Sequence, residues 1–135
     1  MRTFLDSCVL LAAWKGKTLL NEARHIMADD SRQFLSSQLV RLETLPKPVF
    51  EKQRAESQFY QDFFADVESI EPMSFDLACE AETLACKYGL SGSDALHIAA
   101  AIRQKADEFF TAEKPGKAMF RVKEIKVVSL YSLQS

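Results

Sequence analysis

Short apolar runs that end in small polar or charged residues recur along the chain and predict strands. The clearest of these runs cover residues 3–6, 33–36, 108–111 and 125–130, and a weaker one covers residues 69–73. Runs of this length and composition are typical of buried strands. The pattern therefore predicts strands spread over the whole chain.

Helical periodicity fills the intervals between these strands. Helices are expected over residues 8–14, 18–27 and 38–45, the last of them stopped by Pro46 and Pro48. Apolar residues three and four apart predict an amphipathic helix within residues 49–67, another that ends at Gly89, and one that starts at residues 91–93. This alternation predicts an α/β fold, a three-layer α/β/α sandwich whose mostly parallel sheet is covered by helices on both faces.

Composition adds a single domain over residues 1–135 to this picture. Hydrophobic residues make up 47% and charged residues 27%, which is ordinary for one globular core. Lysine and arginine number 17 against 19 aspartates and glutamates, so the formal net charge is −2. A nucleic-acid-binding domain usually shows a basic excess. Contact with RNA must therefore be local, or depend on metal ions that reverse the sign of the site.

The cysteines and the apolar runs indicate in which cellular compartment the protein is expected. No run approaches the roughly 20 apolar residues of a membrane helix, and Asp6 interrupts the first one, which makes a poor signal peptide. The cysteines are odd in number, and Cys79 and Cys86 lie roughly 10 Å apart along a predicted helix, too far for a disulfide. They also lack the paired spacing of a zinc site. We therefore expect a cytoplasmic protein without a membrane anchor.

Four acidic residues fall just past predicted strands or at helix starts. Asp6 ends the first strand, Glu43 lies on the helix after the second, Asp94 opens a helix, and Glu113 follows the strand over residues 108–111. In open parallel sheets, ligands bind beyond the carboxyl ends of the strands. Crowded carboxylates repel one another, and Mg²⁺ or Mn²⁺ relieves that repulsion. Such a site can activate water and stabilise the charge on a phosphodiester.

Each acid also has a purely structural explanation. Asp6 could cap a helix, Glu43 could be a solvated helical glutamate, and Asp94 has the spacing of a capping box with Ser91. His97, three residues after Asp94, is read as packed or hydrogen-bonded, because hard ions prefer oxygen ligands. A further pair, Asp107 and Glu108, begins a strand and should lie at the opposite edge of the sheet.

Several segments resemble PIN-domain proteins in order along the chain. MRTFLDSCVLLAAW looks like the family's opening strand and aspartate, FLSSQLVRLE like its second segment, and LSGSDALHIAAAI like its most recognisable stretch. FFTAEKP resembles a strand that ends in Thr-x-Asp, and IKVVSL resembles the last strand. The resemblance spans nearly the whole chain and is loosest over residues 49–73.

The resemblance implies a parallel sheet of about five strands and a metal-dependent endoribonuclease. It also implies a VapC-like toxin that is held inactive by an antitoxin and forms a homodimer. By the matching positions, Mg²⁺ or Mn²⁺ would be held by Asp6, Glu43, Asp94 and Glu113, with Ser7 and Thr111 assisting the RNA substrate. Glu113 stands where the family usually has aspartate, a departure that concerns a second metal position and not the fold.

Rival interpretations differ at identifiable residues. A phospho-signalling receiver would suit Lys114 and Pro115, but residues 69–73 offer no phosphoacceptor aspartate. A haloacid-dehalogenase-type phosphatase would need a second aspartate where Cys8 stands. The remaining alternative is a PIN fold that has lost catalysis and serves as an RNA- or protein-binding module, a reading favoured by Glu113 and by the acidic net charge.

Two further groups of side chains are candidates for contacts with partners. Four rings within six residues exceed one narrow stripe, so we expect this helix to contribute to a partner or dimer surface. They are Phe59, Tyr60, Phe63 and Phe64. Basic residues near the proposed site could hold phosphates. They are Lys15, Lys17, Arg41, Lys114 and Lys117.

Overall fold

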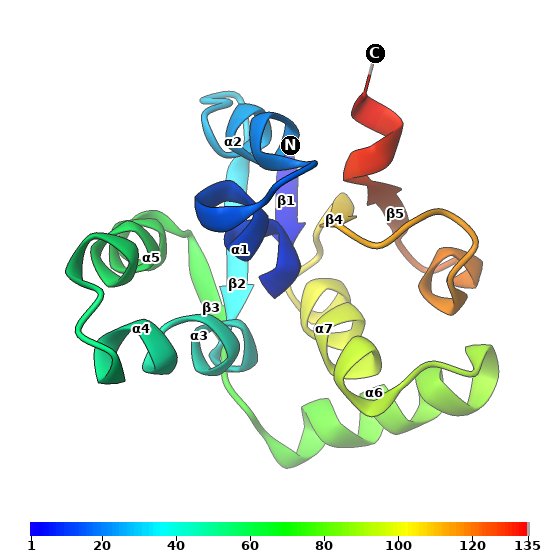
Figure 1. The fold of residues 1–135 in the computed structure, drawn as a ribbon. Coiled ribbons are helices and arrows are strands. Elements are labelled where there is room, and N and C mark those ends of the chain that lie inside the picture. Colours follow the sequence, from blue (N-terminus) through cyan, green and yellow to red (C-terminus); the bar gives the residue numbers. More distant parts are fainter. Residues whose placement is uncertain (135) are drawn as a thin grey trace.

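Five strands form one sheet in the order β3-β2-β1-β4-β5, and every neighbouring pair is parallel (Figure 1). The computed structural model describes residues 1–134. Each strand lies within two residues of its predicted place, so the predicted parallel α/β fold is confirmed. The strands are β1 (Arg2–Leu5), β2 (Gln33–Ser37), β3 (Ser69–Glu71), β4 (Glu108–Thr111) and β5 (Lys126–Ser129).

Helices cover both faces of this sheet. Right-handed crossovers place the helices before β3 on one face and those between β3 and β4 on the other. In agreement, α1 packs against α2, α3 and α5, whereas α6 packs against α7. None of the described helices could cross a membrane. The helices are α1 (Ser7–Lys15), α2 (Leu20–Met27), α3 (Gln38–Thr44), α4 (Pro46–Phe50), α5 (Arg54–Asp66), α6 (Phe75–Tyr88) and α7 (Gly92–Arg103).

Strand β1 lies at the centre of the sheet and of the core. Phe4 and Leu5 have no solvent exposure, and the ring of Phe4 stacks on that of Phe109 in β4 at 5.5 Å. A strand buried on both faces reads as a continuous apolar run, which explains why β1 and β4 were recognisable from the sequence. The burial of β1 and β4 in the core therefore fixes the position of their carboxyl ends.

The amino-terminal edge of the sheet holds a separate buried polar cluster. Glu108 accepts a hydrogen bond of 2.9 Å from Thr3 Oγ1 and forms an ion pair with Arg32. Arg32 also pairs with Asp29 at 2.9 Å. The expectation that Glu108 lies at the edge opposite Asp6 is confirmed, and the carboxylate has a structural partner there.

The predicted stop of the third helix before Pro46 is confirmed. Helix α3 ends at Thr44, and Pro46 starts the short helix α4, which was not expected. Proline suits the first turn of a helix, because its missing N–H would have no partner there. Lys52, with φ of 57°, then breaks the chain before α5, so Val49 does not belong to the long amphipathic helix.

The aromatic cluster on α5 is core, and its assignment to a partner surface is wrong. Tyr60, Phe63 and Phe64 are 0%, 8% and 5% exposed. Helix α5 faces both the sheet and α1: the Phe63 ring lies 6.0 Å from Phe34, and the Phe59 ring lies 5.3 Å from Trp14. A helix between two neighbours buries a wider arc than a single stripe.

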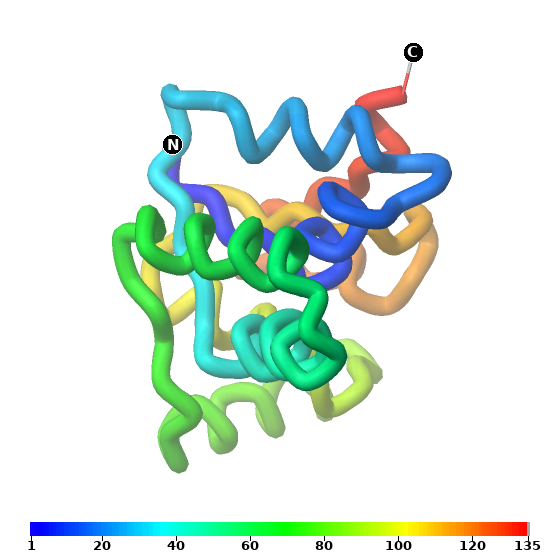
Figure 2. Tube along the Cα trace, turned by 60° about the vertical axis from the view of Figure 1, so that its left-hand side comes forward, coloured from blue at the N-terminus to red at the C-terminus, as the bar shows by residue number. Residues whose placement is uncertain are grey.

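Two short 3-10 helices, Ala118–Arg121 and Leu130–Leu133, complete the chain. Neither was expected, because four-residue turns carry little periodicity. Figure 2 shows the C-terminal segment beside the turn between α1 and α2. A hydrogen bond of 3.2 Å from Gln134 Nε2 to the Thr18 carbonyl joins the two.

Candidate active site

Asp6 lies directly after β1, and its carboxylate is held by hydroxyl groups. Thr111 Oγ1, at the end of β4, donates to Asp6 Oδ2 at 3.0 Å, and Ser7 Oγ lies 3.4 Å from Asp6 Oδ1. Asp6 is the residue before helix α1, yet its side chain makes no capping hydrogen bond. The capping explanation of Asp6 is therefore not borne out.

Glu43 approaches the same point from α3. Its Oε1 accepts a hydrogen bond of 2.8 Å from Ser7 Oγ and lies 2.7 Å from His97 Nε2. The hydrogen bond with His97 holds the pKa of Glu43 below its usual value, against the opposing effect of partial burial, and the bond from Ser7 adds to this. Glu43 is thus turned toward the sheet, although its neighbour Leu42 is 67% exposed.

Asp94 stands in the first turn of α7, half-buried. Its backbone N–H donates to Ser91 Oγ at 3.3 Å, so Ser91 caps the helix as the sequence suggested. Burial raises the pKa of the Asp94 carboxyl, and the negative charges of Asp6 and Glu43 raise it further. The carboxylates of Asp6, directly after β1, and Glu43, on α3, are therefore close enough to Asp94 to disfavour its charged form.

His97 joins this acidic group from inside the protein. Its Nε2 lies 2.7 Å from Glu43 Oε1 and 3.6 Å from Asp6 Oδ1, and the residue is 2% exposed. Burial lowers its pKa, but Glu43, Asp6 and Asp94 together outweigh burial, and the net shift is upward. The prediction of a hydrogen-bonded histidine is confirmed. Its role as the link between two acids was missed, although the spacing of three from Asp94 puts both on one helix face.

Glu113 is connected to the group only through its backbone. Its N–H donates to Thr111 Oγ1 at 3.1 Å, and its carbonyl accepts from Ser129 Oγ at 2.6 Å. Among the interactions of residues 1–134, its exposed carboxylate has neither a hydrogen bond nor an ion pair. The structure thus brings Asp6, Glu43 and Asp94 together and leaves the Glu113 side chain apart.

Cys8 lies behind Thr111. Its Sγ is 3.4 Å from Thr111 Oγ1 and accepts a hydrogen bond of 3.2 Å from the Ala112 N–H. Burial, with the nearby charge of Asp6, raises the pKa of the Cys8 thiol to about 12. A neutral thiol is a weak nucleophile, so Cys8 supports the Thr111 turn and does not serve as a reactive group.

The side chains at this edge offer the donor atoms that a divalent cation prefers, but they are not arranged around one metal position. Within residues 1–134, no three His, Cys, Asp or Glu side chains stand positioned around one metal point. Glu43 instead faces His97. The donors are nevertheless the carboxylate oxygens that Mg²⁺ and Mn²⁺ prefer. The pKa of Asp94 is raised by burial and, after it, by the charges of Asp6 and Glu43, and a cation would offset those charges. Asp6 and Asp94 therefore suit such an ion, and Ser7 and His97 hold the Glu43 carboxylate at the same edge of the sheet.

The basic residues expected near the site are mostly engaged in other contacts. Lys15 Nζ lies 3.6 Å from Glu56, Arg41 stacks over the Phe64 ring at 5.2 Å, and Lys114 lies 5.9 Å above the Tyr131 ring. All are exposed, and Lys114 follows β4 at the acidic edge. Lys114 is therefore the basic residue best placed to reach a phosphate there.

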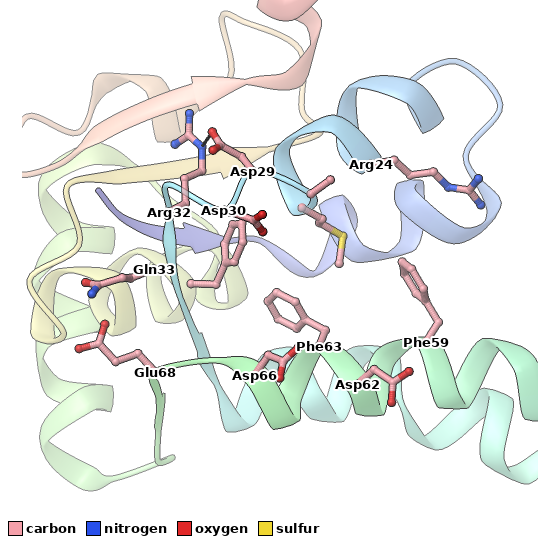
Figure 3. A pocket seen from close by; sticks show the side chains of 13 residues that line it. Arg24, Asp29, Asp30, Arg32, Gln33, Phe59, Asp62, Phe63, Asp66 and Glu68 are labelled. Atoms are coloured by element: carbon pink, nitrogen blue, oxygen red, sulfur yellow. Dashed lines mark hydrogen bonds and ion pairs between the residues drawn. The ribbon is translucent and has the colours of Figure 1, made fainter.

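A cavity of about 660 Å³ lies at the other edge of the sheet, between α2, α5 and the start of β2. Figure 3 shows Asp62 and Asp66 on α5 near the rings of Phe59 and Phe63, with Asp30 across from them. The acidic side chains that line this cavity would repel phosphate groups. None of the candidate site residues at the carboxyl ends of the strands lines it. We therefore do not assign RNA chemistry to this cavity.

Comparisons with known proteins agree with this geometry. The model of the PIN domain family matches residues 3–115. Two solved structures match 96% of this chain over 98% of their own, each with a TM-score of 0.70. One is a toxin–antitoxin complex from Klebsiella pneumoniae, 20% identical, and the other is VapBC2 from Rickettsia felis bound to a DNA fragment from its promoter, 15% identical. At these identities the likeness establishes the fold. No curated protein matches the sequence.

Proposed function

The chain belongs to the PIN-domain family, and from this premise we propose that it is a metal-dependent endoribonuclease, the toxin of a toxin–antitoxin pair. The observation that carries the proposal is the meeting of Asp6, Glu43 and Asp94 at the carboxyl edge of the sheet. Burial and the negative charges of Asp6 and Glu43 disfavour the charged form of Asp94, and such a cost is typical of functional sites.

Each side chain has a role in the proposed reaction. Asp6 and Asp94 would hold Mg²⁺ or Mn²⁺, which supplies activation of water and stabilisation of charge on the phosphodiester. Thr111 and Ser7 orient the Asp6 carboxylate by hydrogen bonds, and Glu43 can accept a proton or bind the ion. Glu113 lies outward, where RNA phosphate would have to complete a second ion's shell.

Partners follow from the same assignment. We propose an antitoxin that covers the acidic edge, an RNA substrate and a homodimer. The three cysteines of the chain are free, which suits a reducing cytoplasm.

The test is cleavage of a mixed RNA substrate by purified protein. Cleavage is expected with Mg²⁺ or Mn²⁺, poorly with Ca²⁺, and not with excess EDTA. Asp6→Asn, purified in parallel, is the matched control for a contaminating nuclease and should be inactive. Full activity in EDTA, or equal activity of Asp6→Asn, would refute the metal-dependent mechanism.

A catalytically impaired RNA- or protein-binding module remains the second candidate. Two observations favour it: the unpaired, outward Glu113 and the lack of a preformed metal group among residues 1–134. Titration calorimetry with Mn²⁺ separates the two functions, because a nuclease must bind the ion whereas a degenerate module need not.

A further inference from the structure

Positive charge is concentrated in the connection from β4 to β5. Residues 114–123 carry four of the chain's 17 lysines and arginines and none of its 19 acids. Because the whole chain has a net charge of −2, the rest of it is acidic on balance. We call residues 114–123 the basic segment. Its four charged side chains, all of them exposed, are Lys114, Lys117, Arg121 and Lys123.

Carboxylates do not neutralise the basic segment. Among residues 1–134, no ion pair joins any of its four side chains to an acid. Arg121 Nη1 donates to a neutral group, the Tyr88 carbonyl, at 3.3 Å. Five basic residues elsewhere are paired with acids: Arg2, Lys15, Arg32, Lys87 and Arg103. The charge of the basic segment is therefore available to an anion from outside the chain.

Buried side chains hold the basic segment on the body of the protein. Met119, Val122 and Ile125 are 1%, 6% and 7% exposed. The 3-10 helix within the segment packs against α6 and α7, and Figure 1 shows this connection, in orange, beside the C-terminal end of α6. The Lys123 N–H also donates to Tyr88 Oη at 3.2 Å. The four charges thus project from an anchored backbone.

Both ends of the basic segment border the acidic edge of the sheet. Lys114 stands just after Thr111, whose hydroxyl belongs to the acidic group. Arg121 contacts Tyr88, the last residue of α6, and a short turn leads from there to α7, which carries Asp94 in its first turn. A strand of RNA that passes the acidic group therefore has the basic segment beside it.

The aromatic rings near the basic segment are already in use. Lys87 Nζ lies 5.2 Å from the centre of the Tyr88 ring, and Lys114 Nζ lies 5.9 Å from that of Tyr131. Phe120 is half-buried against the core. Proteins that grip single-stranded nucleic acid by its bases stack those bases on exposed rings. The segment suits phosphate groups better than bases.

We propose that the basic segment binds the phosphates that neighbour the cleaved one, through charge and without preference for sequence. The ligand's identity as RNA rests on the proposed function, which this inference deepens. An acidic protein on the segment would be repelled by Asp6, Glu43 and Asp94 beside it. A phosphodiester can instead share a cation with those carboxylates.

The first experiment measures binding without cleavage. Asp6→Asn in EDTA is titrated into a short fluorescein-labelled RNA of mixed sequence, and anisotropy is followed at several salt concentrations. Four phosphate contacts predict a slope of about −2.8 for log K against log salt, and loss of two contacts predicts about −1.4. Adding Lys117→Gln and Lys123→Gln should therefore weaken binding about tenfold at low salt. The matched control is Lys105→Gln, exposed at the opposite edge of the sheet, which should change neither quantity.

The second experiment measures cleavage in the presence of Mg²⁺. In the wild-type background, Lys117→Gln with Lys123→Gln should raise KM and leave kcat unchanged, because these contacts are the same in the ground state and the transition state. Arg121→Lys keeps the charge and should bind RNA as the wild type does. Melting curves check that each variant is folded.

The outcomes separate this proposal from the proposed function. RNA binding without cleavage would refute the nuclease and support the role of the basic segment. Cleavage with an unchanged KM in the double variant would overturn the role of the segment alone. An equal loss of binding in Lys105→Gln, or a polyglutamate peptide that binds as tightly as RNA, would also overturn it, the latter by pointing to an acidic protein.

Discussion

His97 Nε2 lies 2.7 Å from Glu43 Oε1, and this contact joins α7 to α3 across the end of the sheet. The two residues are 54 positions apart in the chain. The contact fixes the direction of Glu43, which would otherwise be a glutamate on a solvated helix. His97 is therefore a positioning residue for the acidic group.

Replacement of His97 tests this role. His97→Leu should lower RNA cleavage roughly 10- to 100-fold, the usual effect of losing a residue that orients a ligand. His97→Gln, whose amide can place an N–H near the position of Nε2, should retain most of the activity. The measurements are kcat and KM for cleavage, with Mn²⁺ affinity by calorimetry. Equal loss in both variants at unchanged melting temperature would contradict the positioning role.

Asp94→Asn should stabilise the metal-free protein while abolishing cleavage. The raised pKa of Asp94 means that its charged form is disfavoured in the folded state, so removing the charge relieves the fold. We expect a rise in melting temperature of about 2 °C in EDTA, reduced by any weakening of the helix cap. Glu113→Gln is the matched control and should leave the melting temperature unchanged. A destabilised Asp94→Asn would show that Asp94 is chiefly a capping residue.

Substitution of Glu113 tests the position where the chain departs from its family. Glutamate carries its carboxylate about 1.5 Å further than aspartate from the same backbone position, which is large against the geometry that Mg²⁺ demands. Glu113→Asp should therefore increase Mg²⁺-dependent cleavage, and Glu113→Gln should reduce it. Mn²⁺ should support the wild type better than Mg²⁺ does. Identical cleavage rates for the wild type and both variants would show that Glu113 plays no part in the site.

The pH dependence of stability tests whether Tyr60 on α5 is buried in the core and not part of a partner surface. Its hydroxyl donates to Glu56 Oε2 at 2.7 Å, so Tyr60→Phe should cost about 1 kcal/mol at neutral pH. Burial and the charge of Glu56 raise the pKa of Tyr60 above its ordinary value of 10.0. Ionisation is therefore easier in the unfolded chain, and the stability of the wild type should fall as the pH rises above 10, without an equal fall in Tyr60→Phe. Urea titrations at pH 7 and at alkaline pH should show the difference between the variants shrinking.

The cysteines should separate into two classes toward a thiol reagent. Cys79 and Cys86 are exposed, whereas Cys8 is half-buried with a pKa raised to about 12. Because the thiolate is the reacting form, two thiols should react quickly at neutral pH and the third only on unfolding. Counting released chromophore with time, and repeating the count with Cys8→Ala, identifies the slow thiol. Three equally fast thiols would show that the turn at Thr111 and Ala112 does not shield Cys8 from the reagent.

The pattern of apolar residues and the order of the elements were enough to place the strands, Asp6 and Asp94. Strand β4 is buried along its whole length, so its apolar run marked both of its ends. Asp6 follows β1, and Asp94 starts the helix that runs back to the beginning of β4, so topology puts both at the carboxyl edge of the sheet. These features depend on periodicity and chain order alone.

Side-chain direction was the part that the sequence could not supply. Glu113 follows β4 as expected, but the turn at Thr111 decides where its carboxylate points. The spacing along α5 predicts one apolar stripe, whereas in the structure Phe59 packs on Trp14 and Phe63 on Phe34. Pro46 reads equally as the end of one helix or the start of the next. In each case a tertiary neighbour settles an ambiguity that spacing leaves open.

The central place of β1 has a consequence for synthesis on the ribosome. Residues 2–5 leave the ribosome before their partner β4, which comprises residues 108–111, and Thr111 lies 105 positions after Asp6. Contacts this distant in sequence form late in folding. On the proposed function, the growing polypeptide cannot cut RNA until β4 has emerged, and that delay gives a partner time to arrive. Nascent chains stalled before residue 108 should accordingly be inert toward RNA, whereas released full-length chains should be active.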